Sequence, residues 1–167
     1  MFQRQVELRR VGEAAATALS RFPEVRSIAL FGSVARPLTR EVPRFQPYRR
    51  LRIEVLHECK DVDLAVWIDR TDDLHALNRA RNTAVSRFFE ETGIGIGANH
   101  TDIFLFEPRT DRYLGRLCRF GTCPKGKAEC PVPGCGRDPF LRQHADFTLD
   151  QNALAEHRIV RLYDRMS

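Results

Sequence analysis

Three aspartates stand at the ends of apolar runs in this chain of 167 residues. Asp61 and Asp63 precede the run 64–68, and Asp102 precedes the run 103–106. Residues i and i+2 of a strand face the same way, so Asp61 and Asp63 should project from one face. Adjacent carboxylates repel each other, and a hard divalent cation is the usual remedy. The spacing indicates a metal site, to which Asp102 adds a third carboxylate if its strand is a neighbour. Taken singly, solvated strand ends and a turn cap are the ordinary alternatives.

A Gly-Ser pair, Gly32 and Ser33, follows another apolar run, Val25 to Phe31. The run is apolar and β-branched enough to form a buried strand, and a short helix should follow the pair. A glycine at such a turn lets backbone N–H groups approach an anion closely. The pair predicts a phosphate-binding turn, although most such turns merely connect two elements.

This order of strand, Gly-Ser, helix, Asp-x-Asp and single Asp covers about residues 25–107 and resembles the nucleotidyltransferase superfamily. DNA polymerase β, aminoglycoside nucleotidyltransferases and the minimal nucleotidyltransferases share that fold. The resemblance implies transfer of a nucleoside monophosphate from a nucleoside triphosphate (NTP) to an acceptor hydroxyl. It also implies that Asp61, Asp63 and Asp102 are catalytic and bind two magnesium ions, with Asp102 on the acceptor side as a candidate general base.

The same resemblance implies that Gly32 and Ser33 contact the phosphates, with Arg36 and Lys60 as further candidates. In family members, fewer residues separate the Gly-Ser turn from the Asp pair, so residues 38–59 are expected to contain an insertion. The insertion is basic and aromatic. Alternation predicts an extra strand within it, carried by Ile53, Val55 and His57.

Apolar spacing predicts the elements that must position these residues. One amphipathic helix is expected over residues 2–21 and another over residues 71–91. Residues 93–97 are rich in glycine and should form a loop before Asp102. The fold class expected is α/β (α+β), with a nucleotidyltransferase-like mixed β-sheet flanked by helices.

The expected core spans residues 1–110, and residues 111–167 form an extension packed on it as one domain. Residues 112–118 suggest a further helix, and residues 159–163 alternate as a last strand at a sheet edge.

Four of the five cysteines cluster in this extension: Cys118, Cys123, Cys130 and Cys135. The N-terminus shows no secretory signal, and without one disulfides rarely persist, so clustered thiols indicate a metal. Four thiolates could bind one tetrahedral zinc ion and fold a segment too rich in proline and glycine to fold by packing alone. We predict structural zinc at residues 118–135, with His144 as a substitute ligand. Unligated thiols or a redox pair are the alternatives.

The composition is that of a soluble globular protein, with 43% hydrophobic and 29% charged residues. No run approaches the roughly 20 apolar residues of a membrane helix, so a cytoplasmic protein without a membrane partner is expected. The net charge of +5 mildly favours anionic partners.

The predicted function is magnesium-dependent nucleotidyl transfer to an acceptor that pocket shape, not a motif, would select. One alternative is a catalytically silent protein of this fold that binds nucleotide or a partner, as antitoxin-like members do beside a helical partner chain. Another is a zinc-stabilised RNA-binding module, whose binding would depend strongly on salt. The complete carboxylate trio favours catalysis.

Overall fold

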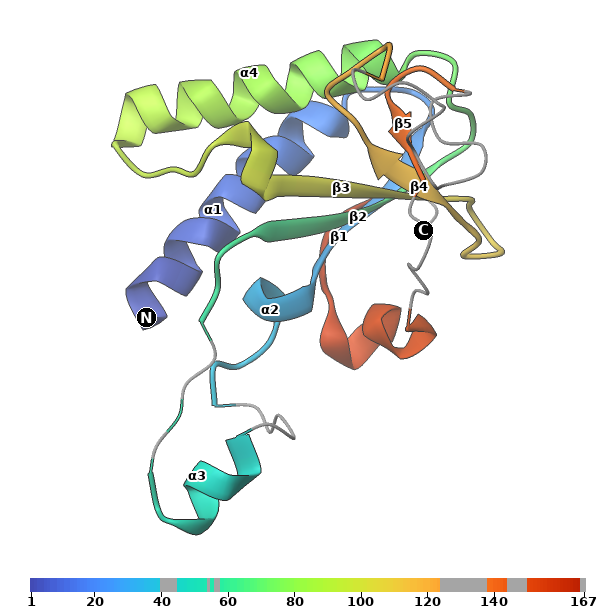
Figure 1. Cartoon of the computed structure of the whole chain (residues 1–167). Coiled ribbons are helices and arrows are strands. Elements are labelled where there is room, and N and C mark those ends of the chain that lie inside the picture. Colours follow the sequence, from blue (N-terminus) through green and yellow to red (C-terminus); the bar gives the residue numbers. More distant parts are fainter. Residues whose placement is uncertain (40–44, 54, 56–57, 124–137, 144–149, 166–167) are drawn as a thin grey trace.

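The computed structural model describes residues 1–39, 45–53, 55, 58–123, 138–143 and 150–165. In these residues a six-stranded sheet has the order β5-β4-β3-β2-β1-β6. Strands β2 and β3 are parallel, and the other neighbouring pairs are antiparallel. The predicted mixed α/β sheet flanked by helices is therefore confirmed (Figure 1). Its strands are β1 (Val25–Phe31), β2 (Val62–Ile68), β3 (Thr101–Phe106), β4 (Tyr113–Leu117), β5 (Leu141–Arg142) and β6 (Val160–Asp164).

Two long helices, α1 (Phe2–Leu19) and α4 (Leu74–Thr92), lie against each other on one side of the sheet (Figure 1). Both predicted amphipathic helices are thus confirmed. Asp73 begins α4, where its carboxylate accepts a hydrogen bond from the Ala76 N–H, and Gly93 ends it in the left-handed region. The short elements are α2 (Gly32–Ala35), α3 (Gln46–Arg50), η2 (Ala98–His100), η3 (Gln151–Leu154) and η4 (Glu156–Arg158).

The two faces of the sheet carry separate apolar clusters, because successive strand residues alternate between faces. The larger cluster joins α1 and α4 to one face, through residues such as Leu8, Leu77, Leu64 and Ile103. The opposite face carries a smaller, partly aromatic cluster beside η3: Ala29, Phe31, Ala65, Trp67, Phe104 and Phe106. Burial on both faces makes the central strands nearly continuous apolar runs, which is why the sequence predicts them.

The last predicted strand is also confirmed, since β6 pairs with β1 at the sheet edge. The helix expected at residues 112–118 is wrong, because this segment forms β4 beside β3. Its apolar residues fit either a helix or a short strand, and pairing with the free edge of β3 decides between them. Gly115, at φ 142°, also has a backbone that an α-helix does not contain.

The insertion carries the short helix α3, which Figure 1 shows set apart from the sheet. The extra strand predicted there is wrong at Ile53 and Val55, which belong to no strand. His57 lies outside the described residues. An alternating segment needs a strand edge to pair with, and a segment held away from the sheet has none.

None of the described helices has the length and apolar character needed to cross a membrane.

Gly115 provides a test of the β4–β5 pairing. A Cβ atom there would lie 2.8 Å from Leu141 Cδ1 and 3.1 Å from the Arg142 carbonyl oxygen, on a backbone at φ +142°. We expect Gly115→Ala to lower the free energy of unfolding by about 2–4 kcal/mol, from strain and overpacking together.

Gly93→Ala is the matched control, because Gly93 also has positive φ but nothing lies within 4 Å of its added Cβ. It should cost only about 1–2 kcal/mol, the strain of the left-handed backbone alone. If urea unfolding showed that both variants lose the same free energy of unfolding, this would contradict the close β4–β5 contact.

Candidate functional site

The predicted carboxylates meet where β1 ends and β2 and β3 begin. Asp63 lies opposite Phe31 of antiparallel β1 and opposite Asp102 of parallel β3. Asp61 lies just before β2, two residues from Asp63. The structure therefore brings Asp63 and Asp102 side by side and places the Gly32 turn next to β2.

These carboxylates belong to the face of the sheet that α1 and α4 leave uncovered. Asp63 has the same parity along β2 as Ala65 and Trp67, and Asp102 has that of Phe104 along β3. Strand residues that point to the opposite face, such as Leu64, pack under the helices. The apolar cluster therefore holds both strands rigidly while the strand ends remain accessible.

Gly32 lies directly against Asp63. A Cβ atom at Gly32 would be only 2.6 Å from Asp63 Oδ2, and the backbone there has φ +72°. Both facts exclude a side chain at this position. The phosphate turn expected from the sequence thus adjoins the central carboxylate.

Side chains of α1 hold the helix that follows this turn. Gln5, which is buried, donates from Nε2 to the carbonyl oxygens of Val34 (3.3 Å) and Arg36 (2.5 Å). Arg9 Nε donates to the Val34 carbonyl at 2.9 Å. These bonds satisfy the carbonyl groups at the end of α2, which a four-residue helix leaves without internal partners. Sequence reasoning missed both residues, since their spacing in α1 signals only an amphipathic helix.

Asp102 forms an ion pair with Arg116 of β4, with Oδ2 2.6 Å from Arg116 Nη1. Both side chains are about three-quarters buried. Burial raises the pKa of Asp102, and Arg116 opposes that shift. The apolar spacing of residues 112–118 predicts a helix and so gives no signal for Arg116, whereas strand alternation would have placed Arg116 on this face.

Asp61 has a partner of its own, His100, at the end of η2. The Oδ1 atom of Asp61 lies 2.6 Å from His100 Nδ1, and both side chains are half exposed. The position of His100 two residues before Asp102 was the available signal, because such spacing on adjacent parallel strands brings it to the level of Asp61.

Among the described residues, Asp63 is the one of the three carboxylates that forms no ion pair. Burial raises its pKa to about 6, with further increases from Asp102 and Asp61 and a decrease from Arg116. A desolvated carboxylate beside two others is a common feature of catalytic and metal-binding sites.

The three carboxylates are chemically suited to magnesium, which prefers hard oxygen ligands. In the described part of the chain, no three or more Asp, Glu, His or Cys side chains are already gathered as a metal cluster. Asp61 and Asp102 instead contact His100 and Arg116. Metal binding at this donor set would therefore exchange these two contacts for a shared cation.

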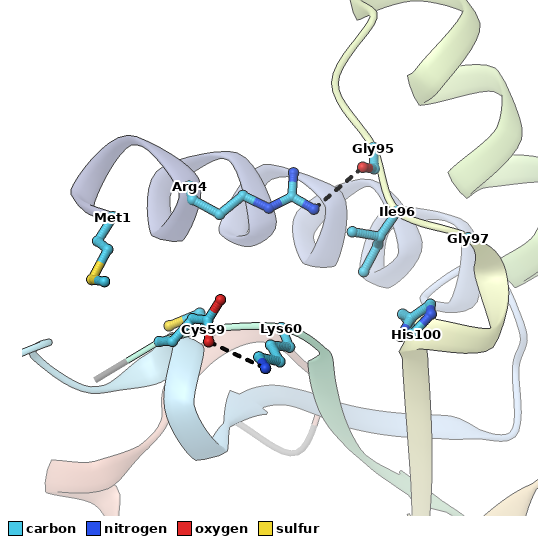
Figure 2. Close-up of a pocket in the computed structure, with 9 residues that line it drawn as sticks. Met1, Arg4, Cys59, Lys60, Gly95, Ile96, Gly97 and His100 are labelled. Atoms are coloured by element: carbon cyan, nitrogen blue, oxygen red, sulfur yellow. Dashed lines mark hydrogen bonds and ion pairs between the residues drawn. The ribbon is translucent and has the colours of Figure 1, made fainter. Parts of the chain in front are cut away.

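Lys60 and His100 line a cavity of about 540 Å³ beside this edge, drawn in Figure 2. Figure 2 shows the N-terminal part of α1 along one side of the cavity, where Arg4 donates to the Gly95 carbonyl oxygen at 3.5 Å. Lys60 Nζ lies 3.2 Å from Glu58 Oε2, and both side chains are mostly exposed. Lys60, a predicted phosphate contact, is therefore engaged in an exposed ion pair with Glu58.

The other predicted phosphate contacts lie in and after α2. Ser33 is partly buried, and its carbonyl oxygen accepts from Cys59 Sγ at 3.4 Å. The Nε atom of Arg36 is buried and has no hydrogen-bond partner in the described residues.

Two of the four predicted zinc ligands, Cys118 and Cys123, are described and carry free thiols. Cys130, Cys135 and the substitute His144 lie outside the described residues. The Cys118 N–H donates to the Phe140 carbonyl oxygen at 2.6 Å, so the chain before and after the cysteine segment is joined at this point.

Comparison of the chain with protein-family models, curated proteins and solved structures found no match.

The raised pKa of Asp63 predicts pH-dependent stability. The folded state holds a proton up to about pH 6, whereas an unfolded Asp releases it near pH 4, so the wild type loses stability as pH rises between these values. In metal-free buffer at pH 8, Asp63→Asn should raise the free energy of unfolding by about 2–3 kcal/mol. Below about pH 4 that gain should vanish, because both side chains are neutral.

Urea unfolding at both pH values measures the effect. Asp72→Asn is the control, because the Asp72 side chain is 77% exposed and pairs only with exposed Arg70 among the described residues. If Asp63→Asn were less stable than wild type at pH 8, this would contradict the conclusion that the charge on Asp63 destabilises the folded state.

Proposed function

We propose that this protein is a magnesium-dependent nucleotidyltransferase that transfers a nucleoside monophosphate from an NTP to an acceptor hydroxyl. The observation that carries the proposal is the in-register pairing of Asp63 with Asp102 on parallel strands, with Gly32 against Asp63. This is the arrangement that the resemblance to the nucleotidyltransferase superfamily implies. The separate ion pairs of Asp61 and Asp102 leave Asp63 as the central ligand.

Each residue has a defined task in this proposal. Asp61 and Asp63 would hold both magnesium ions, and Asp102 would hold the ion on the acceptor side. Bound magnesium would supply charge neutralisation at the triphosphate and make the acceptor hydroxyl more acidic. The Gly32–Ser33 turn would position the triphosphate beside Asp63, since only a glycine leaves room there.

In the transfer step, the acceptor oxygen forms a bond to the α-phosphorus. The bond between that phosphorus and the oxygen that bridges it to the β-phosphorus breaks, and its electron pair leaves with pyrophosphate. The hydroxyl proton passes to the Asp102 carboxylate, which must lie within hydrogen-bond reach of the acceptor oxygen. Positioning and electrostatics provide most of the catalysis in such reactions.

Nucleotide binding tests the proposal before the acceptor is known. Calorimetric titrations with nonhydrolysable ATP, GTP, CTP and UTP analogues should show magnesium-dependent binding of at least one. The double variant Asp61→Asn, Asp63→Asn should lose this binding, because neutral amides bind magnesium far more weakly than carboxylates do. Replacement of Asp63, the carboxylate with the raised pKa, should not unfold the protein, and circular dichroism of the variant would check this.

Asp72→Asn again serves as the control, since it removes one exposed carboxylate from outside the site. Magnesium-dependent binding that survives in the double variant would contradict the assignment of these ligands. Absence of binding for all four analogues in the wild type would instead favour the silent, partner-binding alternative.

Structural zinc in the C-terminal extension remains a separate prediction. The purified protein should contain one zinc ion per chain by elemental analysis. Cys123→Ser should release it and lower thermal stability, because metal binding contributes folding free energy to segments of this kind. A zinc-free wild-type protein would contradict the prediction without affecting the carboxylate site.

A further inference from the structure

A second cavity, of about 550 Å³, opens beside Asp102 on the side of β4 and β5. Four arginines line it, whereas Asp102 is the one carboxylate among the described residues around it. They come from separate parts of the chain: Arg81 of α4, Arg116 of β4, Arg119 just after β4 and Arg142 of β5. The cavity is therefore strongly cationic, and it adjoins one end of the row of three carboxylates Asp61, Asp63 and Asp102, which we call the carboxylate row.

Among the described residues, pairing leaves most of this positive charge uncompensated. Asp102 neutralises Arg116. Arg81 is 4% exposed, and its hydrogen-bond partners among the described residues are neutral: Asn78, Asn82 and the Thr101 carbonyl. Burial lowers the pKa of Arg81 accordingly.

The two outer arginines, Arg119 and Arg142, line the cavity and are exposed. Arg142 lies opposite Arg116 across the β4–β5 pair, so both project from the face that carries the carboxylates. The exposed Arg119 guanidinium lies 4.5 Å from the centre of the partly exposed Phe120 ring. Guanidinium groups bind carboxylate and phosphate oxygens in pairs, and a desolvated one gains most from a counter-charge.

We propose that this cavity binds an oxyanion group, a phosphate or a carboxylate, of the acceptor substrate. The inference rests on the proposed function and names its acceptor class: a small hydroxyl compound that carries such a group. An anion held by Arg81 and Arg142 anchors the molecule, and its hydroxyl then reaches Asp102 at the cavity wall. The volume suits a small molecule, since ligand cavities are typically about 300–1,000 Å³. Polynucleotides are instead bound along extended basic grooves.

Inorganic phosphate and acetate are the probes, each titrated into the ¹⁵N-labelled full chain while amide shifts are followed. The buffer contains no metal and no chelator, because chelators are themselves polycarboxylates, and the ionic strength is constant. We expect saturable binding of at least one anion. Arg142→Gln and Arg119→Gln should each raise its Kd about tenfold, the loss of one charge-assisted contact. Both side chains are exposed, so neither change threatens folding.

Arg79→Gln is the matched control, because Arg79 is an exposed arginine of α4 that lines a different hollow. An unchanged Kd in this variant shows that the response depends on place rather than on net charge. Equal weakening in Arg79→Gln, or no saturable binding of either anion, overturns the proposal. Preferential binding of single-stranded RNA with a steep salt dependence would also overturn it.

Repeating the titration with a saturating magnesium–NTP analogue separates this inference from the proposed function. Anion binding that persists beside the bound analogue supports two sites, whereas competition places the anion in the triphosphate seat and overturns the inference. If no analogue binds while arginine-dependent anion binding remains, the acceptor role fails with the proposed function. The anion titration and the nucleotide titration can therefore fail independently of each other.

Discussion

The parallel pairing of β2 with β3 is the constraint on which the site depends. It places Asp63 directly beside Asp102 at the start of both strands. Two carboxylates held together and partly desolvated oppose folding, and the raised pKa of Asp63 expresses that cost. The apolar residues that follow on both strands are buried on the two faces of the sheet and keep the pair in register. The unfavourable arrangement is thus imposed by the core, as is common at functional sites.

The surroundings of the three carboxylates are unequal in a way that suits cation binding. His100 contacts Asp61 and Arg116 contacts Asp102, whereas Asp63 lies between them against the bare backbone of Gly32. Each outer partner offsets part of the repulsion among the three carboxylates. The Asp61–His100 contact is half exposed, whereas the Asp102–Arg116 pair is about three-quarters buried. Asp63 would gain most from a bound cation, since it forms no ion pair among the described residues.

The sequence was sufficient for features that are local to one segment. Strand-end carboxylates at i and i+2, a glycine turn after an apolar run and a buried strand each leave a short pattern. The arginines were not predictable in this way. The apolar positions around Arg116 fit both a helix and a strand, and its role appears only when β4 pairs with β3. Likewise, Gln5 reaches α2 across some 30 residues of chain, which no periodicity reveals.

The carboxylate row ends in an opening on each side. His100, the partner of Asp61, lines one cavity, and Asp102 lines the other. Phosphoryl transfer proceeds in line, so the attacking and leaving oxygens must lie on opposite sides of the phosphorus. A donor seated at the Gly32 turn would present its α-phosphorus to the carboxylates between the two openings. Under the proposed function, the arginine-lined opening at Asp102 would be the side from which an anionic acceptor attacks, and pyrophosphate would leave on the opposite side. In that proposal, the unequal distribution of charge around the three carboxylates would set the direction of the reaction.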